Sequence, residues 1–244
     1  PVQRGEEPTI PVHKLSPLSE DEVVQAAFAI PIEKNDIGER YVLTVTRQGM
    51  IKKSLVTELP GASANRFTLV KVNEGDELFR VLLTDGKQEV LLTTAKGMSI
   101  RFSETDVRPM GLLAAGVNGI KLKEGDYVVG ASLIEAGNEV GLVTNQGWAK
   151  RIKAEEFPQQ GRYGQGVISW KLKGEDSIVV QLCGKLTDRG VCHFRKSASK
   201  VFTLTNAVER TRQANGQILF KLKPDDELIG FTCLDDFSSY WEKA

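Results

Sequence analysis

The feature that most constrains this sequence is a motif that returns every 50 residues. Each copy begins at a lysine and reaches an aspartate five residues later, and the four copies run over 71–76, 121–126, 171–176 and 221–226. An apolar pair follows each aspartate, as at Leu78-Phe79. Periods of this length are typical of arrays and propellers, in which each unit buries its core against its neighbours. We therefore expect stacked, similar units.

A second recurring element lies between these copies. Short runs rich in leucine, valine and threonine lead into a turn that contains Gly49, Gly97 or Gly147, and a second run follows. This pattern predicts a β-hairpin, with the glycine at positive φ. In the fourth repeat, the corresponding segment around 196–200 has lost the glycine.

Each unit thus holds about four short strands, and little of the chain shows helical periodicity. The prediction is an all-β fold, a propeller-like closed array of four-stranded blades. Four of the nine prolines lie in 1–20, which we expect to be a linker or lead-in. Residues 21–244 then form one domain of four to five blades, and 21–30 is a spare strand that pairs with the last repeat and closes the ring.

The charge is balanced overall but not along the chain. With 32 basic and 32 acidic residues, the protein is neither a histone-like protein nor an acidic disordered one. Residues 141–221, however, contain fourteen basic and six acidic residues, a net charge of +8. Such a stretch can attract polyanions, although an ordinary solvated surface has the same composition.

Little in the sequence favours catalysis or a membrane. There are two histidines, His13 and His193, and no cluster with the spacing of metal ligands or phosphate-binding loops, so we expect no catalytic site, metal or cofactor. No apolar run approaches 18 residues, so no membrane span is expected. Three cysteines without a Cys-x-x-Cys motif predict a reducing, cytoplasmic setting.

Basic residues recur at fixed distances from the hairpin glycines. Lys53, Arg101 and Arg151 come four residues after the glycine, and Lys52 and Lys150 come three after it. If the blades are equivalent, these cations form a solvated row along one edge, which suits the phosphates of a bent duplex. Arg151→Ala would then weaken DNA binding and leave the fold intact. The full set of predicted DNA-binding residues is Lys52, Lys53, Arg101, Lys150, Arg151, Lys153, Arg162, Arg195, Lys196 and Lys200.

Two further groups have open interpretations. The lysines that alternate with leucine point away from the core, either as a solvated face or as DNA contacts; they are Lys121, Lys123, Lys171, Lys173, Lys221 and Lys223. Trp148 follows a hairpin glycine, and we expect it to pack between blades, with contact to DNA as the alternative.

Several segments carry a family resemblance. The run Val-Arg-Pro-Met-Gly at 107–111, with 116–122 and 124–126 after it, closely resembles the C-terminal domain of gyrase A, as do 49–53 and 164–168. The resemblance covers roughly 21–234; topoisomerase IV shares the repeat, and the Arg-Pro-Met-Gly segment favours gyrase. It implies a β-pinwheel, whose blades exchange strands, and a domain that binds and bends double-stranded DNA on its outer rim. Its implied partners are the rest of gyrase A and gyrase B, and the family's cleavage, ATP and metal sites lie outside this domain.

The sequence departs from the family at one motif. Gyrase A carries a box, Q-R-R-G-G-x-G, in its first blade, and the nearest match here is a degenerate box made of Gln160, Gly161, Arg162, Tyr163, Gly164, Gln165 and Gly166. Either a box-bearing blade precedes Pro1 or the protein lacks an intact box, so the resemblance implies DNA binding more directly than full wrapping and supercoiling. The rival hypotheses are a propeller-type protein-interaction scaffold and, less favoured, a propeller enzyme.

Overall fold

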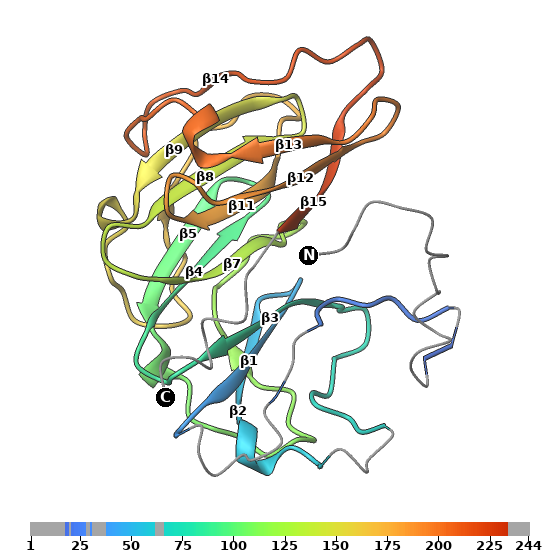
Figure 1. The fold of residues 1–244 in the computed structure, drawn as a ribbon. Helices are drawn as coiled ribbons and strands as arrows, with labels where there is room; N and C mark the ends of the chain where they lie inside the picture. The colour runs from blue at the N-terminus through green and yellow to red at the C-terminus, as the bar shows by residue number, and fades with distance from the viewer. Residues whose placement is uncertain (1–17, 20, 28–29, 31–37, 62–65, 234–244) are drawn as a thin grey trace.

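The architecture is a set of four small antiparallel β-sheets arranged as blades around a central channel (Figure 1). The structure is a computed structural model, and it describes residues 18–19, 21–27, 30, 38–61 and 66–233. Figure 1 shows the blades following one another in chain order, from the blue strands at the bottom to the orange and red strands at the top. The predicted fold class, an all-β propeller-like array, is confirmed.

The blades share one plan. The first contains β1 (Tyr41–Thr46), β2 (Met50–Leu55), β3 (Leu78–Thr84) and β6 (Val117–Asn118). The second contains β4 (Glu89–Thr94), β5 (Met98–Ser103), β7 (Val128–Ile134) and β10 (Val167–Ile168). The third contains β8 (Glu139–Thr144), β9 (Trp148–Lys153), β11 (Ile178–Gly184) and β14 (Gln217–Ile218), and the fourth contains β12 (Arg189–Phe194), β13 (Lys200–Thr203) and β15 (Leu228–Cys233). Short 3-10 helices follow the second strand of each blade: η2 (Val56–Glu58), η3 (Glu104–Asp106), η4 (Ala154–Glu156) and η5 (Leu204–Asn206).

The outer strand of each complete blade comes from the next repeat. In sequence, β6 lies between β5 and β7, but it pairs with β2 of the first blade. By the same rule β10 pairs with β5, and β14 pairs with β9. The order from the channel outward is therefore β3-β1-β2-β6 in the first sheet, while the described part of the fourth sheet has three strands and leaves the outer side of β13 without one. This exchange is the pinwheel arrangement that the resemblance implied.

The hairpin glycines make this exchange possible. Gly49, Gly97 and Gly147 have φ of 77°, 87° and 80°, as predicted. The carbonyl oxygen of Gly97 accepts hydrogen bonds from the backbone N–H groups of Ser169 (2.8 Å) and Trp170 (3.2 Å), which follow the exchanged strand β10. A Cβ at Gly97 would lie 2.3 Å from the carbonyl oxygen of Trp170. Only a residue without a side chain lets the neighbouring repeat approach this closely.

The repeated aspartate fixes the same turn from the other side. The Oδ1 atom of Asp126 accepts hydrogen bonds from the backbone N–H groups of Lys96 in the hairpin turn (3.0 Å) and of Tyr127 (2.9 Å). Asp226 does the same with Lys196 (2.9 Å), although that turn has no glycine. The aspartate thus recurs every 50 residues because each hairpin turn needs an acceptor for its backbone N–H groups.

The hydrophobic core lies between consecutive blades. One cluster joins Leu43 and Ile51 of the first blade to Leu92 and Phe102 of the second. Equivalent clusters join the second blade to the third and the third to the fourth. No blade therefore buries its core alone, as the repeat predicted.

The predicted spare strand over 21–30 is wrong for the part that is described. Residues 21–27 form no strand; Val24 to Ala27 instead line the central cavity, which has a volume of about 910 Å³. The side chain of Ala26 packs on the cluster that contains Val81 of β3, so apolar contact holds this segment without backbone pairing. The rest of the proposed strand and most of the proposed linker lie outside the described residues, and the boundary at residue 21 stays a prediction.

The close approach at the hairpin glycines gives a testable expectation. Gly147 and Gly137 have similar φ, 80° and 77°, but a Cβ at Gly147 would lie 2.4 Å from the carbonyl oxygen of Phe220, whereas one at Gly137 would meet nothing within 4 Å. Both alanine variants incur the cost of a positive φ, about 1–2 kcal/mol. Gly147→Ala should lower the free energy of unfolding, measured in urea, by at least about 1 kcal/mol more. Equal losses would show that the clash relaxes freely.

Candidate nucleic-acid interface

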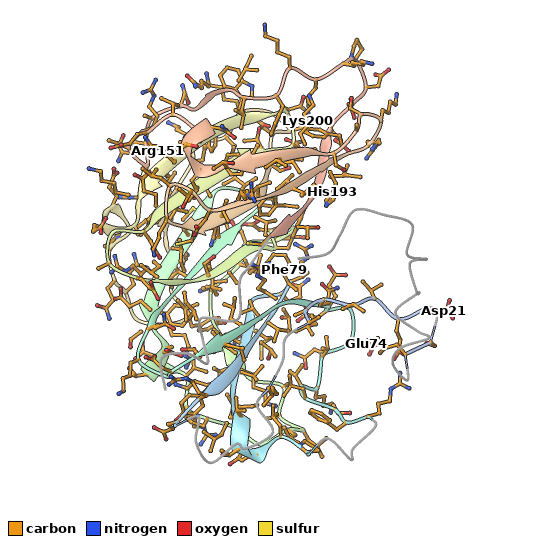
Figure 2. The ribbon with its side chains drawn as sticks, viewed as in Figure 1. Asp21, Glu74, Phe79, Arg151, His193 and Lys200 are labelled. Carbon is orange, nitrogen blue, oxygen red and sulfur yellow. The ribbon has the colours of Figure 1, made fainter. Side chains whose placement is uncertain are left out.

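Two of the predicted DNA-binding arginines lie between blades. Arg101 on β5 donates hydrogen bonds from Nη1 to the carbonyl oxygens of Ala154 and Phe157, both 3.1 Å, at the 3-10 helix η4 of the next blade. Arg151 on β9 donates from Nε to the carbonyl oxygen of Ala207 (3.0 Å), just after η5 (Figure 2). The two side chains are only 19% and 18% exposed. Each arginine therefore joins its own blade to the following one.

Lys53 plays the same part in the first blade. Its Nζ donates to the carbonyl oxygen of Glu104, the first residue of η3, at 2.9 Å, and it lies 5.0 Å from the centre of the Tyr41 ring. Burial lowers the pKa of Lys53. We call Lys53, Arg101 and Arg151 the latch cations. Two latch cations also pair with an acid of their own blade: Arg101 with Glu89, and Arg151 with Glu139 (2.6 Å).

The lysines one position earlier are buried as well. Lys150 donates from Nζ to the carbonyl oxygens of Arg212 (2.7 Å), Ala214 (2.9 Å) and Thr211 (3.3 Å). Lys52 donates to those of Leu112 (2.8 Å) and Leu69. Lys150 thus binds three carbonyls of the loop that leads to β14, whereas Lys52 binds one carbonyl of the loop that leads to β6 and one of the segment that precedes β3. Burial of its ammonium group lowers the pKa of Lys150 to about 8.

These contacts correct the expectation of a solvated cationic row. Lys52, Lys53 and Lys150 are buried, and Arg101 and Arg151 are more than four-fifths buried, so none of the five presents an open charge on the rim. The physical reason is the strand exchange, which covers β2, β5 and β9 with the next repeat. The expectation that Arg151→Ala leaves the fold intact stays untested, but the contacts of this side chain with the next blade predict a loss of stability instead.

The degenerate box also has structural roles. It forms the outer loop that leads to β10, where the N–H of Tyr163 (φ 67°) donates to the carbonyl oxygen of Gly119 and the N–H of Lys121 donates to that of Gly164, both 2.9 Å. Gln160 donates its N–H to the carbonyl oxygen of Arg101 (2.8 Å). A Cβ at Gly166 would lie 2.3 Å from the carbonyl oxygen of Ser99, while Gly161 and Gln165 are exposed.

Arg162 has a counterpart that the sequence analysis missed. Its guanidinium donates to the carbonyl oxygens of Asp106 (3.3 Å) and Asn118. Arg212, 50 residues later, donates to those of Glu156 (2.7 Å) and Ile168 (2.8 Å), which lie at the equivalent positions. The repeat itself contained the signal, because the two arginines share one position. Both arginines therefore attach an outer loop to the preceding repeat by hydrogen bonds to its backbone carbonyls.

The remaining predicted cations are exposed. Lys153 lies 3.7 Å from Glu209, Arg195 pairs with Glu227, and Lys196 lies 3.9 Å from Asp225. Lys200 (Figure 2) is at the position of Lys52 and Lys150, but no outer strand covers β13 among the described residues. The Nζ of Lys200 lies over the rings of Phe194 and Phe220.

One periodic set of cations is uniformly exposed. Its members follow the exchanged strand, or the segment equivalent to it in the first repeat, and precede the turn that leads to the inner strand; they are Lys71, Lys121, Lys123, Lys171, Lys173, Lys221 and Lys223. We call this set the lysine row. The Nζ of Lys96 donates to the carbonyl oxygen of Glu124 (2.7 Å), so the row lies beside the hairpin turns. It is a regular series of exposed lysines, with one or two per repeat.

Other functional chemistry is sparse in the part of the chain that the structure describes. These residues contain no group of three or more histidine, cysteine, aspartate or glutamate side chains that could hold a metal ion. They also contain no helix that is long and apolar enough to cross a bilayer. The three cysteines are free thiols, and burial raises the pKa of both Cys183 and Cys192 to about 12, which makes them poor nucleophiles.

Comparison with known families identifies the fold. The model of the DNA gyrase C-terminal domain, a β-propeller, matches residues 40–85, 88–135, 139–180 and 200–235, most of the chain. The chain belongs to this family. The matched segments agree with the four blades, and the resemblance expected from the sequence is confirmed.

Relatives and solved structures agree. The chain is 38% identical over 111 residues to the DNA gyrase A protein of Halalkalibacterium halodurans and 37% identical over 110 residues to that of Escherichia coli K12. These matches cover 46% and 45% of this chain but only 13% and 12% of the relatives. The crystal structure of the C-terminal domain of DNA topoisomerase IV superposes with a TM-score of 0.81 at 28% identity, covering 91% of this chain and 69% of that one. A gyrase A C-terminal domain gives 0.75 at 21%, covering 90% and 73%, which supports the fold.

The latch geometry predicts a structural phenotype for Arg151→Ala. The substitution removes an ion pair with Glu139 and leaves the carbonyl of Ala207 without this donor. It should lower the free energy of unfolding by about 1–3 kcal/mol, measured in urea. Lys153→Ala on the same strand is the matched control, because that side chain is exposed and should cost less than about 0.5 kcal/mol. An Arg151→Ala protein as stable as the control would contradict the latch.

Lys150 predicts a pH dependence. Its folded pKa, about 8, lies below the ordinary 10.5. Between these values the unfolded chain binds more protons, so the contribution of Lys150 to stability rises with pH. Relative to Lys150→Met, the parent protein should gain on the order of 1–2 kcal/mol between pH 7.5 and 9.5. Urea unfolding of both proteins at the two pH values measures this, and a difference that does not change with pH would show that the pKa is not lowered.

Proposed function

We propose that this domain binds duplex DNA along its outer rim, bends it, and serves as the DNA-wrapping part of a type IIA topoisomerase. The observation that carries the proposal is the lysine row, because it is a set of exposed cations repeated at one position around a curved array. Phosphate contacts from such a row give sequence-independent affinity, and their curvature matches a bent duplex. Bending 20–30 base pairs costs about 1–6 kcal/mol, so several contacts must act together.

Charge and family membership support the same proposal. The net +8 of residues 141–221 includes Lys171, Lys173 and Lys221 of the row. Four exposed cations among the predicted DNA-binding residues lie in the same region and are retained as phosphate contacts; they are Lys153, Arg195, Lys196 and Lys200. The latch cations and the buried Lys52 and Lys150 are left out of the proposed interface, and Arg162 is given a positioning role in the outer loop.

Gyrase A is the favoured parent protein. The curated relatives reported above are gyrase A proteins, and the domain of topoisomerase IV with the same fold is the alternative. On this proposal the partners are duplex DNA, the rest of gyrase A and gyrase B, and the setting is the bacterial cytoplasm. The domain presents DNA for strand passage, while the chain itself neither cleaves DNA nor requires ATP, a metal or a cofactor.

The lysine row makes a specific prediction for binding. Lys171→Ala with Lys173→Ala should weaken binding to a linear duplex and lower the slope of log K against log salt by about one per lost contact. Lys87→Ala with Lys185→Ala is the matched control, because these exposed lysines lie in the loops at the other end of the strands. Fluorescence anisotropy between 50 and 300 mM salt is the measurement. Binding by the parent that does not depend on salt would exclude the electrostatic mechanism and favour a protein-interaction scaffold.

A further inference from the structure

The outer rim of the third blade carries an exposed apolar pair. Trp148, the first residue of β9, lies directly opposite Ile218, the last residue of the exchanged strand β14. Directly opposed residues place their side chains on the same face of a sheet, with Cβ atoms about 4.5–5.5 Å apart. Trp148 is 38% exposed and Ile218 is 52% exposed. The expectation that Trp148 packs between blades is therefore incomplete, because more than a third of the surface of this residue is exposed.

The position recurs, which shows that the fold itself does not require this pair. In the second blade Met98 lies opposite Ile168, which is 48% exposed. In the first blade Met50 lies opposite the polar, exposed Asn118. A blade thus forms with a polar residue at the outer position. The isoleucines at 168 and 218 leave apolar surface in water without a structural need, as interaction sites often do.

The surroundings of the pair favour DNA as the occupant. Lys221 of the lysine row comes three residues after Ile218, as Lys171 does after Ile168. Lysine is depleted in protein–protein interfaces, and a standard interface buries about 800 Å² per partner, far more than two side chains expose. An apolar projection beside phosphate-binding cations is the arrangement with which DNA-bending proteins unstack a base step and kink the duplex.

We infer that Trp148 and Ile218 form an apolar wedge that enters a base step of the duplex held by the lysine row and kinks it at the third blade. This inference rests on the proposed DNA-binding function and adds where and how the bend is made. Met98 and Ile168 form a smaller wedge one blade earlier, while the first blade contributes charge alone. The kink should favour flexible steps such as TA, whose unstacking is less costly than that of an A-tract.

The test separates bending from binding. Trp148→Ala with Ile218→Ser removes the wedge and keeps the lysines, and Leu113→Ser, at a side chain that is 76% exposed in an outer loop, is the matched control. The probes are two 30-base-pair duplexes, one with a central TA step and one with a central A-tract, labelled at both ends for energy transfer. The double variant should bind within about threefold of the parent, with the same salt slope, but bend the duplex less. Its preference for the TA duplex should also be smaller than that of the parent, with any remainder due to Met98 and Ile168.

The outcomes are distinguishable. A double variant that bends both duplexes as the parent does overturns the wedge, while DNA binding by the parent still supports the proposed function. A parent that binds neither duplex overturns both. If the variant changes the sedimentation of the free protein from an oligomer to a monomer and leaves bending unchanged, the pair is a contact between copies. The emission of Trp148 itself can be obtained by subtracting the fluorescence of Trp148→Phe from that of the parent. This emission should be quenched when duplex is added to the intact wedge. If it is not quenched, Trp148 lies away from the bases.

Discussion

The structure depends on the exchange of one short strand between consecutive blades. Because the outer strand of a blade comes from the next repeat, the chain passes from the outer edge of one sheet to the inner strand of the next. The latch cation binds the segment that leads into the exchanged strand, and the hairpin glycine accepts hydrogen bonds from the residues that follow it. Two residues of pairing per blade would be weak alone, and the buried cations of β2, β5 and β9 add charge-assisted hydrogen bonds to backbone carbonyls of the next repeat.

This arrangement explains why periodic basic residues divide into two classes. The cations three and four residues after a hairpin glycine, on β2, β5 and β9, are covered by the incoming repeat and become structural, whereas a lysine that follows the exchanged strand lies beyond that cover and stays in water. Lys200 illustrates the rule, because it occupies the position of Lys150 and yet is exposed where the outer strand is missing from the described part of the fourth sheet. Whether a basic side chain at this position is exposed therefore depends on whether an outer strand covers it, and not on the type of residue.

The features that could be predicted from the sequence are those that depend on a few neighbouring residues. The hairpins, the positive φ of Gly49, Gly97 and Gly147 and the 50-residue repeat could be derived from spacing, whereas the number of blades was left at four to five and the strand exchange came only from the family resemblance. The roles of Arg101 and Arg151 could not be derived, because a 50-residue period is the same for a charge that faces solvent and for one that meets the next blade. The segment at 21–27 was mistaken for a strand because its apolar residues, which contact the channel, resemble half of a repeat. Arg212 could have been found from Arg162 by the repeat alone.

The incomplete fourth sheet has a consequence for cooperativity. The latch position there is Val201, which is exposed, and no exchanged strand covers β13 among the described residues. Since each blade contacts mainly its neighbours, opening can spread along the array one blade at a time, and the end with the fewest links opens at the lowest free energy. For the described residues, we therefore expect the amide hydrogens of β12 and β13 to exchange ahead of those of β4 and β5, so that protection against exchange falls from the middle blades toward the fourth.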